Sequence, residues 1–385
     1  MLEKLGIHGI INASGTLTIL GGNRLVPEAL EAIIEVSDKF IDMEELSINA
    51  GRYVAKLVNA SDAFITSGAA AGIVIAIGAI MTEGDPSKMS RLPFTEGMKN
   101  KIIVQYPHTI NNPYLHLVDI PGARIKIVGG QSGVKKEDIQ EAIDDDVAGI
   151  LHFFYEPQNN ELPLEEVLAI AHEHKIPLIL DAAAELPPAT NLKKFIGLGC
   201  DVVIFSGGKD IGAPNDTGVI LANDKNFIDN CRKIGPWSYL KVDSIERVFI
   251  GRALKMSKED VVAFVAAFEK YLKTDHEARL ARMNSIADLI ITSLQSNFPN
   301  LDVEKIIFNP GERIRPANIP KVAIHLPGGM ALKCMEDLKS ENPAIYTYVK
   351  EDRLYLNTHC LRDSEVDTVI SRLLYILRLR LNDTR

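Results

Sequence analysis

Short apolar runs alternate with segments of helical spacing between about residue 60 and residue 225. The apolar runs are continuous rather than alternating, which predicts strands that are buried on both faces. Segments such as 164–174 (LEEVLAIAHEH) lie between these runs and have the spacing of helices. This order predicts an α/β fold with a mostly parallel sheet covered on both faces. The predicted strands are 101–105, 124–128, 147–154, 177–181, 201–205 and 217–222.

The pattern changes after residue 245. Residues 257–272 are expected to form a helix with Ser257 as its N-cap and acidic residues in its first turn. We therefore expect a large α/β domain with an N-terminal arm at 1–250, a linking helix at 251–275 and a smaller α+β domain at 276–385. The smaller domain is expected to contain a helix at 278–298, a strand, a helix near 330–340, a hairpin at 345–358 and a final helix from 363.

Composition narrows the classes of function. The hydrophobic share of 46% and the charged share of 24% are those of an ordinary globular protein. A net charge of −9 disfavours a protein that binds the backbone of a nucleic acid. The four cysteines form no CxxC pair, so neither a zinc site nor a disulfide framework is expected, and a reducing compartment fits. His172 and His174 are two residues apart on a predicted helix, so no metal site is expected.

One apolar run, 63–81 (AFITSGAAAGIVIAIGAIM), is nearly long enough to cross a membrane. It is rich in small residues and opens with Thr-Ser-Gly, so a buried helix with a capped start is expected instead. The first ten residues lack the basic-then-apolar pattern of a secretion signal. Together these features predict a cytoplasmic protein without a membrane partner.

Three features lie where an open α/β sheet binds ligands, just beyond the carboxyl ends of strands. Asp181 ends the strand PLILD, Lys209 follows DVVIF on a Gly-Gly turn, and Ser67-Gly68 opens the apolar helix. A lysine amine condenses with an aldehyde, and an aspartate can keep a pyridine nitrogen protonated. A helix start offers N–H groups to a phosphate, to which Ser206 could add a hydroxyl. The pattern thus favours pyridoxal phosphate (PLP) chemistry.

Simpler interpretations stay open for each feature. Asp181 could cap the next helix, Lys209 could be a solvated loop residue, and Ser67-Gly68 could be an N-cap alone.

Two nucleotide-binding patterns are excluded. A phosphate-binding P-loop needs Ser or Thr after its lysine, where this chain has Asp210. The Gly-Gly pairs at 129–130 and 207–208 lack the spacing of a dinucleotide-binding fingerprint.

Five stretches carry a resemblance to a known family. The chain resembles PLP-dependent enzymes of the aspartate-aminotransferase fold (fold type I), and within them the selenocysteine-synthase-like family. That family includes bacterial L-seryl-tRNA selenium transferases and D-glucosaminate-6-phosphate ammonia-lyases. The resembling stretches are 11–22 (INASGTLTILGG), 64–73 (FITSGAAAGI), 178–188 (LILDAAAELPP), 205–218 (FSGGKDIGAPNDTG) and 251–260 (GRALKMSKED).

The resemblance assigns roles to single residues. It implies Lys209 as the Schiff-base lysine and Asp181 as the residue at the pyridine nitrogen. His108 falls where the family places a residue over the cofactor ring, although a partly buried loop histidine would look the same. The other implied residues are Ser67, Gly68 and Ala69 around the phosphate, Arg252 and Lys255 as an anion-binding pair or a solvated helix end, and Asn12 and Ser14 on the substrate side.

The resemblance implies a PLP-dependent lyase. Its substrate would be a small anionic 2-amino-3-hydroxy acid such as D-glucosaminate 6-phosphate, which would lose its hydroxyl and its ammonia to give a 2-keto acid. The fold implies a homodimer or a higher homo-oligomer. The alternatives are a transferase acting on seryl-tRNA and a silent homologue that only binds PLP or phosphate.

Two departures from the family bear on these choices. Relatives tend to have Arg-Gly-Pro-Gln after the lysine, where this chain has Gly-Ala-Pro-Asn at 212–215. The missing arginine removes a possible contact to an anion. The segment before INASG is too short for the tRNA-binding domain of the bacterial selenium transferases, which disfavours the transferase.

Overall fold

The computed structural model describes residues 1–154, 160–307 and 318–382, and its contacts divide the chain into two compact units. The larger unit is Leu25–Thr274, and the smaller unit combines Met1–Arg24 with Asp275–Arg385. The contacts thus group the N-terminal arm with the C-terminal unit, whereas the sequence pattern grouped it with the large domain. The predicted linking helix is α9 (Lys258–Lys273), which belongs to the larger unit and begins with the predicted Ser257 cap.

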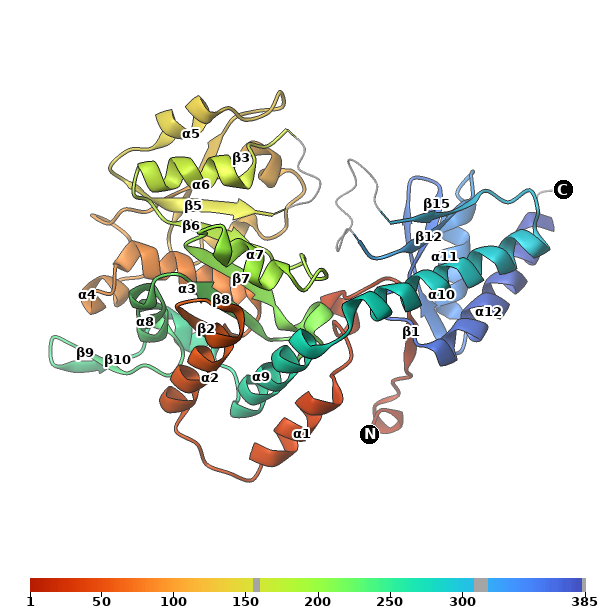
Figure 1. The fold of residues 1–385 in the computed structure, drawn as a ribbon, viewed down its shortest axis with the longest axis horizontal. Coiled ribbons are helices and arrows are strands. Elements are labelled where there is room, and N and C mark those ends of the chain that lie inside the picture. The colour runs from red at the N-terminus through yellow and green to blue at the C-terminus, as the bar shows by residue number, and fades with distance from the viewer. Residues whose placement is uncertain (155–159, 308–317, 383–385) are drawn as a thin grey trace. The chain divides into compact units, whose positions relative to one another are not determined.

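The larger unit is built on a seven-stranded sheet in the order β2-β8-β7-β6-β5-β3-β4 (Figure 1). Only β8 is antiparallel to its neighbours, which confirms the mostly parallel α/β sheet. All six predicted strands are present. The strands are β2 (Asp62–Thr66), β3 (Lys101–Gln105), β4 (Arg124–Val128), β5 (Val147–Phe153), β6 (Leu178–Asp181), β7 (Val202–Ser206) and β8 (Gly218–Ala222).

Both faces of this sheet are covered by helices, because successive residues of each strand point to opposite sides. In β3, Ile103 packs in one hydrophobic cluster while Ile102 and Val104 pack in the other. Helices α3 (Ala69–Thr82) and α8 (Lys225–Ile234) cover the face of Ile102. The opposite face carries α1 (Pro27–Val36), α2 (Met43–Val58), α5 (Lys136–Ala142), α6 (Leu164–Glu173), α7 (Asn191–Gly197) and α9. A short helix, α4 (Pro86–Met89), and a hairpin of β9 (Leu240–Val242) and β10 (Ile245–Arg247) complete the unit.

The structure corrects the prediction that the apolar run 63–81 forms one buried helix with a capped start. Its first residues form β2, and the helix α3 begins only at Ala69. The predicted capped start is also wrong in its chemistry, since Gly68 is the N-cap and makes no side-chain cap hydrogen bond. A continuous apolar run can hold a strand and a helix in succession, which periodicity alone does not separate. Across the described residues, none of the helices has the length and apolar character needed to cross a bilayer.

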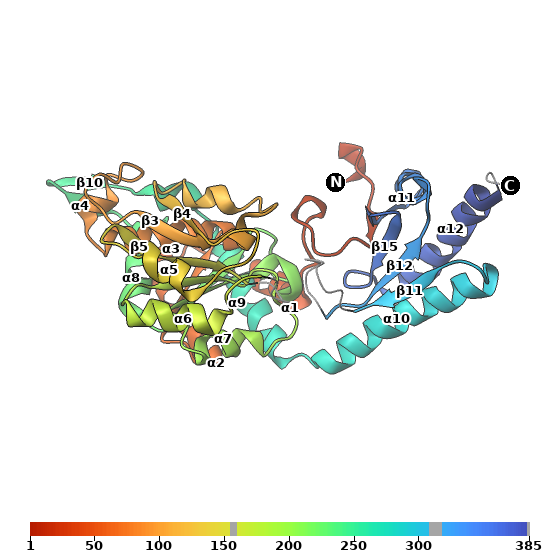
Figure 2. The ribbon, with the colours of Figure 1, turned by 90° about the horizontal axis from the view of Figure 1, so that it is seen from above.

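The smaller unit is an α+β unit with a four-stranded antiparallel sheet in the order β11-β12-β15-β14. Figure 2 labels β11, β12 and β15 of this sheet. Strand β1 (Ile10–Asn12) pairs in parallel with β13 (Ala344–Tyr346), which joins the two ends of the chain. The Arg24 guanidinium reinforces this join, because it lies 2.6 Å from a carboxylate oxygen of Glu365. The other elements are β11 (Val303–Ile306), β12 (Lys321–His325), β14 (Tyr348–Lys350), β15 (Arg353–Asn357), α10 (His276–Asn297), α11 (Met330–Ser340) and α12 (Asp363–Asn382).

Candidate active site

The carboxyl ends of three strands meet at one edge of the large sheet. Ser206 at the end of β7 and Thr66 at the end of β2 both pair with Gly218 of β8. Asp181, the last residue of β6, pairs with Ile204 of β7. The segments that follow these strands therefore leave from the same edge, where open α/β sheets bind ligands. The structure brings the predicted Asp181, Ser206 and Ser67–Ala69 segment to this edge.

Lys209 lies on a wide turn, η5 (Gly207–Ile211), directly after β7. The Gly207 N–H donates to the carbonyl of Thr217 at 2.8 Å, which holds the start of the turn against the neighbouring segment. The N–H of Gly212 donates to the carbonyls of Gly207 and Lys209 and closes the turn. The backbone of Lys209 departs from helical geometry, with φ −99° and ψ −119°. This break sets the direction in which the lysine side chain leaves the turn.

The charges of Lys209 and Asp181 act on each other. Burial lowers the pKa of the Lys209 amine, and the carboxylates of Asp181 and Glu185 oppose this shift. Burial raises the pKa of Asp181, while the Ala183 N–H, which donates to Oδ1 at 2.9 Å, and Lys209 oppose it. Each group is thus poorly solvated and stabilised by an opposite charge. Glu185 had no predicted role, although it lies four residues after Asp181 in a stretch that carries the family resemblance.

The start of α3 offers backbone N–H groups without a side-chain cap. Gly68 has φ +93°, and no atom lies within 4 Å of where a Cβ would be. A phosphate therefore has both room and the positive end of a fourteen-residue helix at this point. The hydroxyl of Ser67 donates to the carbonyl of Leu254 at 2.8 Å. Its proton is engaged there, so the first N–H groups of α3 are the stronger candidates for holding an anion.

Gly218 allows the start of α3 to lie close against β8. A Cβ at this position would lie 2.6 Å from both the nitrogen of Ala69 and the carbonyl carbon of Gly68. Gly218→Ala is therefore expected to displace the helix start and to raise the Kd for PLP by about tenfold, equivalent to roughly 1.4 kcal/mol. Absorbance titration with PLP measures this change. Gly197→Ala at the end of α7 is the control, because a Cβ there meets nothing within 4 Å. Equal affinities of the two variants would contradict the role of Gly218.

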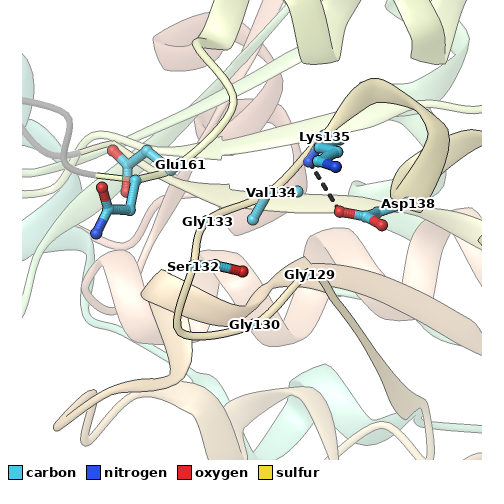
Figure 3. A pocket seen from close by; sticks show the side chains of 9 residues that line it. Gly129, Gly130, Ser132, Gly133, Val134, Lys135, Asp138 and Glu161 are labelled. Carbon is cyan, nitrogen blue, oxygen red and sulfur yellow. Dashed lines mark hydrogen bonds between the residues drawn. The ribbon is translucent and has the colours of Figure 1, made fainter.

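His108 lies on η3 (Tyr106–Thr109), just after β3, and is fully buried. Its Nε2 lies 3.1 Å from Oε2 of Glu161, which is also buried, and its ring makes an edge contact with the ring of His152 at 4.6 Å between centroids. Glu161 also lines a pocket formed by the glycine-rich loop 129–135 (Figure 3). The place of His108 over a cofactor ring stays a prediction, and no sequence pattern indicated Glu161 as its partner.

The tautomer of His152 follows from its neighbour Gln105. The N–H of Leu162 donates to Oε1 of Gln105 at 2.7 Å, which assigns the amide oxygen. The amide nitrogen therefore faces Nδ1 of His152 at 3.3 Å and donates to it. His152 must be neutral with its proton on Nε2, in agreement with burial, which lowers its pKa well below the ordinary value.

Arg252 and Lys255 line a groove formed with the segment 37–44 and Trp237. The bond from Ser67 to Leu254 holds their segment beside the start of α3. Their predicted role toward an anion stays a prediction. Asn12 and Ser14 belong to the smaller unit.

The amide of Asn12 builds its own loop. Its nitrogen donates to the carbonyl of Gly15 at 2.8 Å, and its oxygen accepts from the N–H of Ser14 at 2.9 Å. These bonds explain the loop geometry, and a contact of either Asn12 or Ser14 with a substrate stays a prediction.

The residues at the sheet edge fit PLP. The half-buried Lys209 can bind its aldehyde through an amine whose pKa is lowered, the Asp181 carboxylate suits a protonated pyridine nitrogen, and the open helix start suits its phosphate. Among solved structures, the chain matches a D-glucosaminate-6-phosphate ammonia-lyase with a TM-score of 0.80 and 25% identity, over 99% of this chain and 98% of that one. It also shares the fold of a serine palmitoyltransferase from S. paucimobilis solved with PLP bound, with a TM-score of 0.56, 14% identity and coverage of 96% and 88%.

Fold and site together define a PLP-dependent enzyme of fold type I. The sequence profile of the L-seryl-tRNA selenium transferase family matches residues 10–362, and the chain belongs to this family. The chain is 30% identical to a D-glucosaminate-6-phosphate ammonia lyase of Salmonella typhimurium over 292 residues, which are 75% of this chain and 74% of that protein. The family model is named for a transferase, whereas this relative is a lyase, so family membership alone does not decide the reaction.

Proposed function

We propose that the chain is a PLP-dependent ammonia-lyase acting on a small anionic 2-amino-3-hydroxy acid. The observation that carries this proposal is the placement of Lys209, Asp181 and the start of α3 at one edge of the sheet, where the charges of Lys209 and Asp181 act on each other. The likeness to D-glucosaminate-6-phosphate ammonia lyases supports the substrate class. The net charge of −9 supports a small substrate over a tRNA.

Each site residue has a task in this reaction. Bound PLP supplies an electron sink for the electron pair left when the substrate α-carbon loses its proton. Nζ of Lys209 takes this proton, and burial favours the neutral amine that a base requires. The carboxylate of Asp181 holds a proton on the pyridine nitrogen. The proton on Nζ then passes to the departing 3-hydroxyl, so that water leaves.

The remaining steps need water and the Lys209 amine. Elimination leaves an enamine of the substrate, which Lys209 would free by replacing the substrate nitrogen at the aldehyde carbon. The free enamine takes up water to give a 2-keto acid and ammonia. The net change is loss of ammonia from the 2-amino-3-hydroxy acid. Arg252 and Lys255 are the cationic side chains that we assign to the acidic groups of the substrate.

Incubation of the PLP-loaded protein with D-glucosaminate 6-phosphate is expected to release ammonia and a 2-keto acid in equal amounts. A turnover number within the usual range of about 1–10³ s⁻¹ would mark a physiological substrate. Coupled assays for ammonia and for the keto acid measure both products. The matched control is the same amino acid without its 3-hydroxyl, which cannot eliminate water and should give no ammonia.

The outcomes separate the proposal from its alternatives. Ammonia from other 3-hydroxy amino acids but not from the sugar acid would keep the lyase and change its substrate. Release from none of them, together with binding of seryl-tRNA in a filter assay, would replace the lyase by a transferase. Release from none and no tRNA binding would indicate a silent PLP-binding protein.

A further inference from the structure

Asp210, the residue directly after Lys209, has a buried carboxylate that the proposed reaction does not use. Its side chain is 3% exposed, and its Oδ2 accepts a 2.5 Å hydrogen bond from the hydroxyl of Tyr271 on α9. Tyr271 is also 3% exposed. A carboxyl group removed from water costs free energy even when it is paired, and an apolar side chain would fill the same volume without that cost. The hydrogen bond to Tyr271 is therefore a specific contact of this turn that an apolar side chain could not make.

A second contact from α9 reaches the other side of the lysine. Phe264 precedes Tyr271 by seven residues, so the two side chains lie two turns apart on one face of the helix. A Cβ at Gly207 would lie 2.7 Å from Cδ2 of Phe264, which shows how closely the turn approaches this ring. Helix α9 thus contacts the lysine turn both before and after Lys209.

These two contacts enclose the point where the backbone changes direction. The residues around Lys209 follow a wide helical turn, but Lys209 itself departs from it. The direction of the lysine side chain therefore depends on how the next residue is held. The hydrogen bond from Tyr271 holds the side chain of Asp210. The backbone hydrogen bonds of the turn act only on the main chain.

We infer that Tyr271 and Asp210 form a positioning pair that holds the Lys209 amine at the cofactor site. The inference rests on the PLP site of the proposed function, but not on the identity of the substrate. Neither residue is a catalytic residue, because each acts on the amine through the backbone of Lys209. The pair sets how often the amine points toward the aldehyde of PLP.

Tyr271→Phe is expected to slow covalent attachment of PLP to Lys209 by about tenfold to a hundredfold, as expected for a displaced reacting group. In this step the Nζ–carbon bond forms and the aldehyde oxygen leaves as water. Borohydride then delivers hydride to that carbon, and mass spectrometry of the Lys209 peptide measures the attached fraction over time. The readout needs no substrate, so a failed ammonia assay leaves it interpretable.

Tyr53→Phe is the matched control. The hydroxyl of Tyr53 on α2 interacts with the carboxylate of Glu269 on the same helix α9, away from the lysine turn. Both variants lose a tyrosine hydroxyl that faces a carboxylate, but only Tyr271→Phe is expected to slow attachment. Attachment at the wild-type rate in folded Tyr271→Phe would overturn the inference.

If Tyr271→Phe does not fold, a comparison of two variants of Asp210 tests the inference instead. Asp210→Asn keeps an oxygen that accepts the tyrosine hydroxyl, whereas Asp210→Ala removes it. Asp210→Asn is therefore expected to attach PLP close to the wild-type rate and Asp210→Ala to be slow. Equal rates for the two variants would also overturn the inference, because the hydrogen bond would then not set the rate.

Discussion

Lys209→Ala is expected to give a folded protein that holds no PLP covalently. Its rate of ammonia release should fall by about 10²-fold to 10⁴-fold. The variant loses the amine that binds the aldehyde and also the base that takes the α-proton. The fold should survive, because the substitution removes an amine that is costly to desolvate, and the Asp181 carboxyl that loses its counter-charge still accepts the Ala183 N–H. Borohydride reduction followed by mass spectrometry tests the attachment, and the ammonia assay tests the rate.

The lowered pKa of Lys209 predicts how the rate of PLP attachment changes with pH. A lysine whose pKa lies below its ordinary value is more often neutral at neutral pH than an exposed lysine. The rate of attachment should therefore rise with pH and level off once the pH passes the lowered pKa.

Lys225→Ala at the start of α8 is the control for Lys209→Ala, since this exposed lysine lies outside the site. A reducible linkage that persists in Lys209→Ala would contradict the assignment of this lysine.

Much of the large sheet could be predicted from the sequence, because its strands are buried on both faces. Val202–Ser206 and Gly218–Ala222 are continuous apolar runs between polar turns, and each lies within one residue of its predicted range. The strand at Asp62–Thr66 could not be separated from α3, because the apolar run continues through both. The pairing of β1 with β13 joins opposite ends of the chain, for which local patterns carry no information.

The candidate site also has some residues whose positions could be predicted from the sequence and others whose positions could not. The positions of Asp181 and Lys209 could be predicted because Asp181 ends one recognisable strand and Lys209 follows another, and strand ends of a parallel sheet share one edge. Their roles toward PLP stay predictions. Tyr271 and Glu161 were not predictable. Tyr271 reaches Asp210 from a helix 61 residues away, and its position on α9 resembles any apolar core position. Glu161 lies in a loop and meets His108 only through the fold. Partners of this kind need the tertiary structure.

Asp181→Asn is expected to lower the rate of ammonia release by about 10²–10³-fold, the usual cost of removing one preorganised electrostatic group. Asparagine keeps the oxygen that accepts the Ala183 N–H, so the local turn should be retained. What is lost is the negative charge that keeps a proton on the pyridine nitrogen. The cofactor then withdraws electrons less strongly, and removal of the α-proton becomes slower.

Asp201→Asn is a closely matched control for this charge. Asp201 lies just before β7, at the opposite end of the strands, and its Oδ2 accepts the Leu178 N–H at 2.9 Å, as Asp181 accepts that of Ala183. Both substitutions remove one charge and keep one backbone hydrogen bond, but only Asp181 interacts electrostatically with Lys209. Covalent attachment of PLP should persist in both variants, while ammonia release should fall only in Asp181→Asn. If both variants release ammonia at the same rate, the charge of Asp181 does not assist the reaction.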